Sequence, residues 1–196
     1  MRRELATSAL AIVALTLLFG LAYPLATTGL AQLLFPGKAD GSRIERDGRV
    51  VGSRLIAQDF GGDRRYFQPR PSATGYDPAG TYFNNLGPNQ RELRNQLRQN
   101  LRAYLRRERP TSPGLAADAV PVDAVATSGS GVDPHISEAN ARIQARRVAH
   151  ARRLALTRVL ELVDENTDER ALGVLGEPGV NVLELNLALD DQEPSA

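Results

Sequence analysis

The most extended pattern in the chain is an apolar segment near its amino terminus. No charged residue occurs from Leu5 to Gly37, and apolar side chains dominate every side of the helix that this segment would form. Because a helix rises about 1.5 Å per residue, roughly 20 such residues cross the hydrocarbon core of a bilayer. We therefore predict a transmembrane anchor over residues 5–34, preceded by a short cytoplasmic tail of residues 1–4.

Basic residues flank this segment on both sides and bear on its orientation. Arg2 and Arg3 lie directly against its start, and they compete with the basic residues that begin at Lys38. Cytoplasmic flanks are enriched in Lys and Arg. We favour a cytoplasmic amino terminus, an extracytoplasmic domain over residues 38–190 and a polar tail over residues 191–196. A cleaved secretory signal is the alternative; its apolar region normally spans only about 7–15 residues, and it would place the domain on the same side.

Turn residues predict a hairpin directly after the anchor. Residues 42–58 carry apolar residues on either side of Asp47-Gly48, a pair that supplies the positive φ angles of tight hairpin turns. Residues 59–88 are rich in Gly, Pro and Asn but contain six aromatic residues. We therefore predict an ordered loop whose rings are buried against the domain or against a partner.

Helical periodicity appears three times further along. Leucines spaced four residues apart predict a helix that opens at Pro88, and we interpret the arginines beside them as a solvated face. Ser137 followed by Glu138 predicts the capped start of a second helix, and apolar residues from Leu156 at helical spacing predict a third. The two rows of the first helix are Leu93, Leu97, Leu101 and Leu105, and Arg94, Arg98, Arg102 and Arg106.

The carboxy-terminal segment alternates apolar and mixed positions. Between residues 182 and 189 every second residue is leucine, which is the period of a β-strand. With the hairpin and the three helices, this pattern predicts a single amino-terminal transmembrane helix followed by an α+β domain with a mixed or antiparallel sheet.

Composition removes several classes of function. The chain has 24 basic and 23 acidic residues, a net charge of +1, so bulk nucleic-acid binding is not expected. Cysteine is absent, which excludes disulfides, thiolate metal sites and cysteine nucleophiles. His135 and His150 are the only imidazoles, too few for a multi-histidine centre, and we predict no metal site.

A glycine-rich stretch before the second helix collects the polar residue types of several site classes. We interpret it as a structural and docking loop that is capped into the following helix, and we predict no catalytic residue in it. Its members are Ser128, Gly129, Ser130, Gly131, Asp133, Pro134, His135 and Ser137.

The same residues also fit two sharper interpretations, a hydrolase and a phosphate-binding loop. A hydrolase would use Ser130, Asp133 and His135, but a nucleophile elbow needs glycine two residues before the serine, and Ser128 stands there. A phosphate-binding loop would need a nearby lysine, and Lys38 is the only lysine in the chain.

Taken together, these blocks resemble the C subunit of the Kdp-type, ATP-driven potassium transport complex of bacteria, the KdpC family. The resemblance spans nearly the whole chain and includes the single amino-terminal span. Six motifs carry it, in order: Gly52-Ser53-x-Leu55-Ile56-x-Gln58-x-Phe60, Tyr66-Phe67-x-Pro69-Arg70-Pro71-Ser72-Ala73, Asn85-Leu86-Gly87-Pro88, Ser128-Gly129-Ser130-Gly131-Val132-Asp133-Pro134-His135-Ile136-Ser137, Gln144-x-x-Arg147-Val148-Ala149-x-Ala151-Arg152, and Gly176-Glu177-Pro178-x-Val180-Asn181-Val182-Leu183-x-Leu185-Asn186-Leu187-Ala188-Leu189.

The resemblance implies a non-catalytic subunit in the bacterial inner membrane. Its partners would be a P-type ATPase subunit that performs the hydrolysis, a channel-like potassium-binding subunit and a small membrane peptide, and potassium would be the transported ion. The family is described as a catalytic chaperone that raises the ATP affinity of the ATPase subunit, with Gln144 and Arg147 as proposed nucleotide contacts. No cofactor would be bound firmly, and ATP would be met through the complex.

Three alternatives stay open at this point. An outside domain cannot reach cytoplasmic ATP, so stabilisation of the complex at the outer mouth of the channel-like subunit competes with the chaperone role. A membrane-anchored envelope hydrolase or a free-standing binding module, using Ser130, Asp133 and His135, is the rival from another class.

One departure from the family pattern is Thr81-Tyr82-Phe83-Asn84, where a Ser-Gly-Gly-Ser stretch is usual.

Overall fold

The chain divides into two compact units, Met1–Ser53 and Arg54–Ala196. The computed structural model describes residues 1–80 and 85–192. The departure at Thr81-Tyr82-Phe83-Asn84 and the last four residues of the predicted polar tail lie outside the described residues. The predicted hairpin lies within the first of these units, and the predicted domain bounds stay a prediction.

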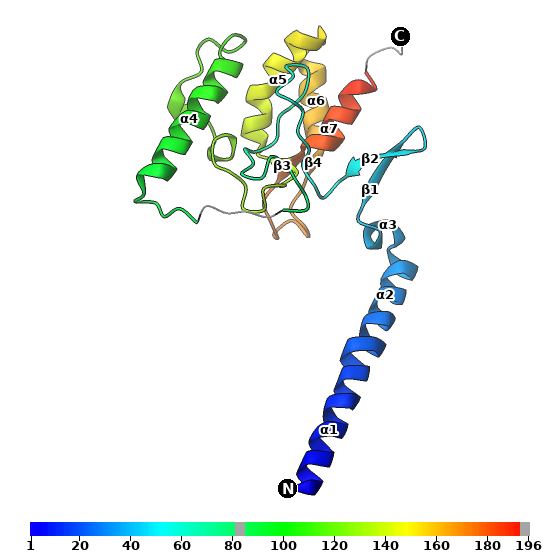
Figure 1. Cartoon of the computed structure of the whole chain (residues 1–196). Helices are drawn as coiled ribbons and strands as arrows, with labels where there is room; N and C mark the ends of the chain where they lie inside the picture. Colours follow the sequence, from blue (N-terminus) through cyan, green and yellow to red (C-terminus); the bar gives the residue numbers. More distant parts are fainter. Residues whose placement is uncertain (81–84, 193–196) are drawn as a thin grey trace. The chain divides into compact units, whose positions relative to one another are not determined.

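The amino-terminal unit is built on a continuous helix of 33 residues, Arg2–Leu34, which has no buried residue and whose most apolar 18-residue stretch has a mean hydropathy of 2.3. At about 1.5 Å per residue it measures about 50 Å, more than the hydrocarbon core requires. This confirms the predicted apolar helix. This helix consists of α1 (Arg2–Leu17), the π-helical turn η1 (Leu18–Ala22) and α2 (Tyr23–Leu34) (Figure 1). After a break at Phe35, the short helix α3 (Pro36–Ala39) follows.

The π-turn has a local cause. Pro24 has no N–H for the carbonyl of Gly20, and its ring would collide with that carbonyl in a regular α-helix. The wider turn Leu18–Ala22 immediately before it relieves the collision, so the helix continues through the proline.

The predicted hairpin is present as β1 (Arg43–Arg46) and β2 (Arg49–Ser53), which pair antiparallel. Asp47 and Gly48 both have positive φ, 51° and 72°, which confirms the predicted turn.

The second unit combines helices with a small antiparallel sheet (Figure 1), which confirms the α+β class. The strand order is β3-β5-β4, and each strand has two or three residues, so the sheet alone cannot support the domain. In chain order the elements are α4 (Arg91–Glu108), the 3₁₀ turns η2 (Ala117–Ala119) and η3 (Val122–Ala124), β3 (His135–Ile136), α5 (Glu138–Arg152), α6 (Leu156–Glu165), β4 (Thr167–Asp168), β5 (Gly179–Asn181) and α7 (Val182–Asp190).

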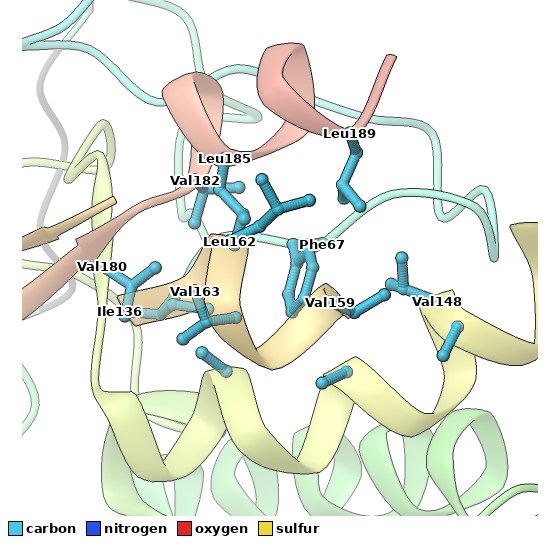
Figure 2. Packing of buried hydrophobic residues seen from close by; sticks show 13 residues of the cluster. Phe67, Ile136, Val148, Val159, Leu162, Val163, Val180, Val182, Leu185 and Leu189 are labelled. Atoms are coloured by element: carbon cyan, nitrogen blue, oxygen red, sulfur yellow. The ribbon is translucent and has the colours of Figure 1, made fainter. Parts of the chain in front are cut away.

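The core lies where α5, α6 and α7 converge over the sheet, and Phe67 from a loop completes it (Figure 2). Ala141 and Ala145 on α5 are fully buried, and their small side chains let other elements approach that helix closely. The labelled core side chains are Phe67, Ile136, Val148, Val159, Leu162, Val163, Val180, Val182, Leu185 and Leu189.

The predicted strand over residues 182–189 is wrong, because this segment is the helix α7. Asn181 caps it: its side chain accepts the Glu184 N–H at 3.2 Å. Val182, Leu185 and Leu189 then follow helical spacing and are all buried. The spacing of the leucines is compatible with a strand and with a helix, and the Asn181 cap stabilises the helix.

The first predicted helix, α4, begins at Arg91 and not at Pro88. Gln90 has an extended backbone, and its side chain accepts the N–H of Gly87 at 2.9 Å, which keeps the preceding turn outside the helix. The row of Arg94, Arg98, Arg102 and Arg106 is exposed along α4, as predicted.

The Ser137 cap yields a stability prediction. Its hydroxyl accepts the N–H of Asn140 at 3.1 Å and donates to Asp123 at 2.7 Å. We expect Ser137→Ala to lower the free energy of unfolding by about 1 kcal/mol, measured by urea denaturation of the full-length chain in detergent. The control, Ser130→Ala in an exposed turn, should change it by less than about 0.5 kcal/mol. Equal losses in the two variants would contradict the capping role.

Candidate functional site

The best-defined polar site in the second unit surrounds a loop segment, residues 64–68, that lies against α5 and α7. Phe67 and Gln68 are buried, with Phe67 fully inaccessible to solvent. The segment belongs to no strand, yet a buried peptide group without a hydrogen-bond partner is costly. Its backbone must therefore be satisfied in another way.

Two side-chain amides, one on α5 and one on α7, bind the backbone of this segment. Gln144 on α5 accepts the Gln68 N–H at 2.9 Å and donates to the Gln68 carbonyl at 3.0 Å. Asn186 on α7 accepts the Phe67 N–H at 2.8 Å and donates to the Phe67 carbonyl at 2.9 Å. Each amide thus takes the place of a neighbouring strand, and both are about 1 % exposed.

Two arginines of α5 bind the remaining carbonyls. Arg147 donates through Nη1 to the carbonyls of Arg64 and Tyr66, at 2.6 and 3.0 Å. Arg152 donates through Nε to the carbonyl of Arg65 at 2.7 Å, and its guanidinium lies 4.7 Å from the ring centre of Tyr66. All five consecutive carbonyls from residue 64 to residue 68 therefore accept hydrogen bonds from side chains.

A buried ion pair connects this arrangement to α4. Arg147 donates through Nε to both carboxylate oxygens of Glu108, at 3.0 and 3.1 Å, and both side chains are fully buried. Burial lowers the pKa of Arg147, and the negative charge of Glu108 opposes that shift. Nearby, the Tyr104 hydroxyl donates to Asn140 at 2.9 Å, and burial raises the pKa of Tyr104.

The structure brings Gln144 and Arg147 together, as their spacing on a helix predicted. Arg147 donates through Nη2 to the Gln144 side-chain oxygen at 2.8 Å. Their polar atoms contact segment 64–68, Glu108 and Asn140. A nucleotide could reach these two side chains only after this buried network opened, and removing one partner of a buried ion pair costs roughly 3–5 kcal/mol. Nucleotide binding by this pair stays a prediction.

The glycine-rich loop packs tightly against the region around residue 72. Gly131 has a φ of 77°, and a Cβ at this position would lie 2.6 Å from Thr74 Oγ1, so only glycine fits. Its carbonyl accepts the Ser72 hydroxyl at 2.6 Å. The N–H of the buried Ser128 donates to the Pro71 carbonyl at 3.1 Å, and Gly129 is exposed.

Ser130, Asp133 and His135 do not form a hydrolytic arrangement. The exposed Ser130 hydroxyl accepts the N–H of Val132 at 3.2 Å. His135 Nε2 lies 3.0 Å from Asp168. In the described part of the chain, the Ser130 hydroxyl and the His135 ring share no hydrogen bond, so the serine has no base beside it.

Asp133 and Pro134 have structural contacts of their own. The Asp133 carboxylate accepts from Arg70 Nη1 at 2.9 Å and from the His135 N–H at 3.0 Å. The Pro134 carbonyl accepts the N–H of Val182, the first residue of α7, at 3.0 Å. A shallow cavity of about 390 Å³ adjoins this region and is lined by Arg70, Asp123, Asp133, His135, Ile136, Ser137, Asp168, Glu177, Pro178 and Gly179.

Sequence reasoning missed four residues that shape these sites: Gln68, Glu108, Asn186 and Asp123. Asp123 accepts the Ser137 N–H and hydroxyl and the side-chain amide of Asn140, which fixes the start of α5. Glu108 had a detectable signal, because it is a lone acid at the end of a helix rich in arginine. Asn186 interrupts a run of leucines, which is also visible in the sequence.

Comparison with known proteins identifies the family. The model of the family described as "KdpC: K+-transporting ATPase, c chain" matches residues 5–191. A Potassium-transporting ATPase KdpC subunit of Rhodospirillum rubrum is 52% identical over 198 residues, covering 100% of both chains. Subunits of the same name from Mycobacterium bovis (48% identical; 97% of this chain and 99% of the relative) and Myxococcus xanthus (56%; 88% and 81%) are also similar. The family resemblance predicted from the motifs is thereby confirmed, and the chain belongs to the KdpC family of K⁺-transporting ATPase subunits.

Proposed function

We propose that this chain is a non-catalytic, membrane-anchored subunit that assembles with and stabilises an ATP-driven potassium uptake complex. The observation that carries the proposal is the match to the KdpC family over residues 5–191, which includes the apolar helix Arg2–Leu34. In this proposal the chain lies in the bacterial inner membrane with its amino terminus in the cytoplasm. Its partners are an ATPase subunit that hydrolyses ATP, a channel-like potassium-binding subunit and a small membrane peptide, and potassium is the cargo.

A scaffolding role fits the way the second unit uses its polar groups. Gln144, Arg147 and Asn186 hold segment 64–68, and Asp133 and His135 contact neighbouring charged residues. These contacts order a surface, and among the described residues the Ser130 hydroxyl bonds the N–H of Val132 while the His135 ring lies against Asp168. We propose that residues 128–137 and the elements around them dock on partner subunits, outside the membrane.

Assembly is the direct test of the proposed function. Affinity purification of the full-length chain, expressed with the other candidate subunits and extracted in mild detergent, should recover two large membrane partners in fixed proportion. Ser130→Ala should leave the potassium-dependent ATPase activity of that complex within about two-fold of the wild type, whereas loss of a nucleophile would remove several orders of magnitude. A chain that purifies alone, or a collapse of activity in an assembled Ser130→Ala complex, would refute the proposal.

The orientation has its own measurement. Because Arg2 and Arg3 border the apolar helix, we expect protease added to sealed spheroplasts to digest the second unit and leave the membrane-embedded helix. Lysis before digestion provides the control, in which both sides are accessible. Protection of the second unit until lysis would place it in the cytoplasm, where contact with ATP becomes possible.

The roles of Gln144 can be separated with a matched variant. Gln144→Ala and Asn186→Ala each leave one buried N–H and one buried carbonyl of segment 64–68 unpaired, so each should lower the unfolding free energy by at least about 1–3 kcal/mol. In the assembled complex, neither should change the apparent ATP affinity of the ATPase. Asn186 is the control, because only Gln144 belongs to the proposed nucleotide contacts. A loss of ATP affinity in Gln144→Ala alone would establish the chaperone description.

A further inference from the structure

The connection between β4 and β5 exposes three large apolar side chains. Leu172, Val174 and Leu175 are 90%, 72% and 60% exposed, and every residue from 171 to 177 is exposed. We call these three side chains the apolar tip. In Figure 1 this connection extends away from the helices of its unit. Large apolar side chains gathered on one exposed connection are typical of interaction sites.

The backbone beneath the apolar tip is well defined. Ala171 and Leu175 exchange two backbone hydrogen bonds, at 2.8 and 2.9 Å, and form an isolated β-bridge. Arg170 and Glu177 pair across the same connection at 2.7 Å. The tip is therefore presented on a closed turn, which reduces the entropy that docking would cost.

The residue at the centre of the tip is in a conformation that leucine rarely adopts. Leu172 has a φ of 55°, and the following Gly173 has a φ of 76°. Glycine and asparagine tolerate this region, whereas a bulky side chain is strained in it. The stability of the isolated domain would favour either of those residues, so a 90% exposed leucine at this position needs a reason outside the domain.

We propose that the apolar tip inserts into a hydrophobic pocket on another subunit of the transport complex, and that basic residues border this pocket. The inference rests on the proposed function. Glu169, Arg170 and Glu177 flank the tip and are all exposed, and Arg170 pairs with Glu177, so the flank keeps one net negative charge that complements a basic rim. Anionic lipid headgroups would repel this net negative charge, which disfavours the bilayer surface as the partner of the tip.

A second copy of this chain is the strongest rival occupant. A cavity of about 560 Å³ beside α4 is lined by three arginines, Arg102, Arg106 and Arg109, together with apolar groups of Leu105 and two prolines. Insertion of the tip there would be a head-to-tail contact between different surfaces. Contacts of this kind produce rings or open filaments of identical chains and not a single bound subunit. We therefore favour a different subunit as the partner that binds the tip.

The test compares Leu172→Asn with Val122→Asn in the full-length chain. Asparagine tolerates positive φ, so Leu172→Asn should unfold at the wild-type temperature or above it while removing the apolar anchor. Val122 is 75% exposed on η3 and serves as the matched control. Each tagged variant is expressed with the other subunits, extracted in mild detergent and diluted, and the retained ATPase and channel-like subunits are quantified.

We expect Leu172→Asn to weaken retention of one partner at least about ten-fold, with Val122→Asn at the wild-type level. Equal retention by both variants, with the wild-type complex intact, would overturn the inference and leave the proposed function standing. A wild-type chain that retains no partner would overturn the proposed function itself. Light scattering that detects self-association of the wild-type chain, abolished by Leu172→Asn, would overturn the inference in favour of a second copy.

Discussion

The fold of the second unit depends on satisfying the backbone of segment 64–68 with side chains. Phe67 can enter the core only if the peptide groups around it are paired, and the three-stranded sheet is too small to pair them. Gln144, Asn186 and the arginines of α5 replace the missing strands. Because Arg147 also binds Glu108, the same network connects α4 to the core. Burying one aromatic ring thus determines much of how loop and helices are joined.

The elements that depend on residues close together in the sequence were predicted correctly. The apolar helix, the Asp47-Gly48 turn and the Ser137 cap each depend on contacts within a few positions, and each was predicted correctly. The error over residues 182–189 has the same origin. Alternating leucines and a helical stripe coexist there, and the Asn181 cap that selects the helix was not weighed.

The candidate site was predictable only in part. The spacing of Gln144 and Arg147 placed them on one face of a helix, but their main partners are backbone groups and an acid far away in the chain. Peptide carbonyls carry no sequence signature, since every residue has one. The side chain of Gln144 meets residue 68 across 76 positions, and Asn186 meets residue 67 across 119. No local pattern encodes such distances.

These long separations also set the order of events during synthesis. Asn186 lies on α7, the last helix of the described residues, yet it holds a segment made more than a hundred residues earlier. Segment 64–68 therefore cannot complete its native hydrogen bonds until Asn186 has left the ribosome. Contacts of this range slow folding, because a long loop must close before they form. We therefore expect a nascent chain lacking α7 to leave the backbone of Phe67 without its Asn186 partner.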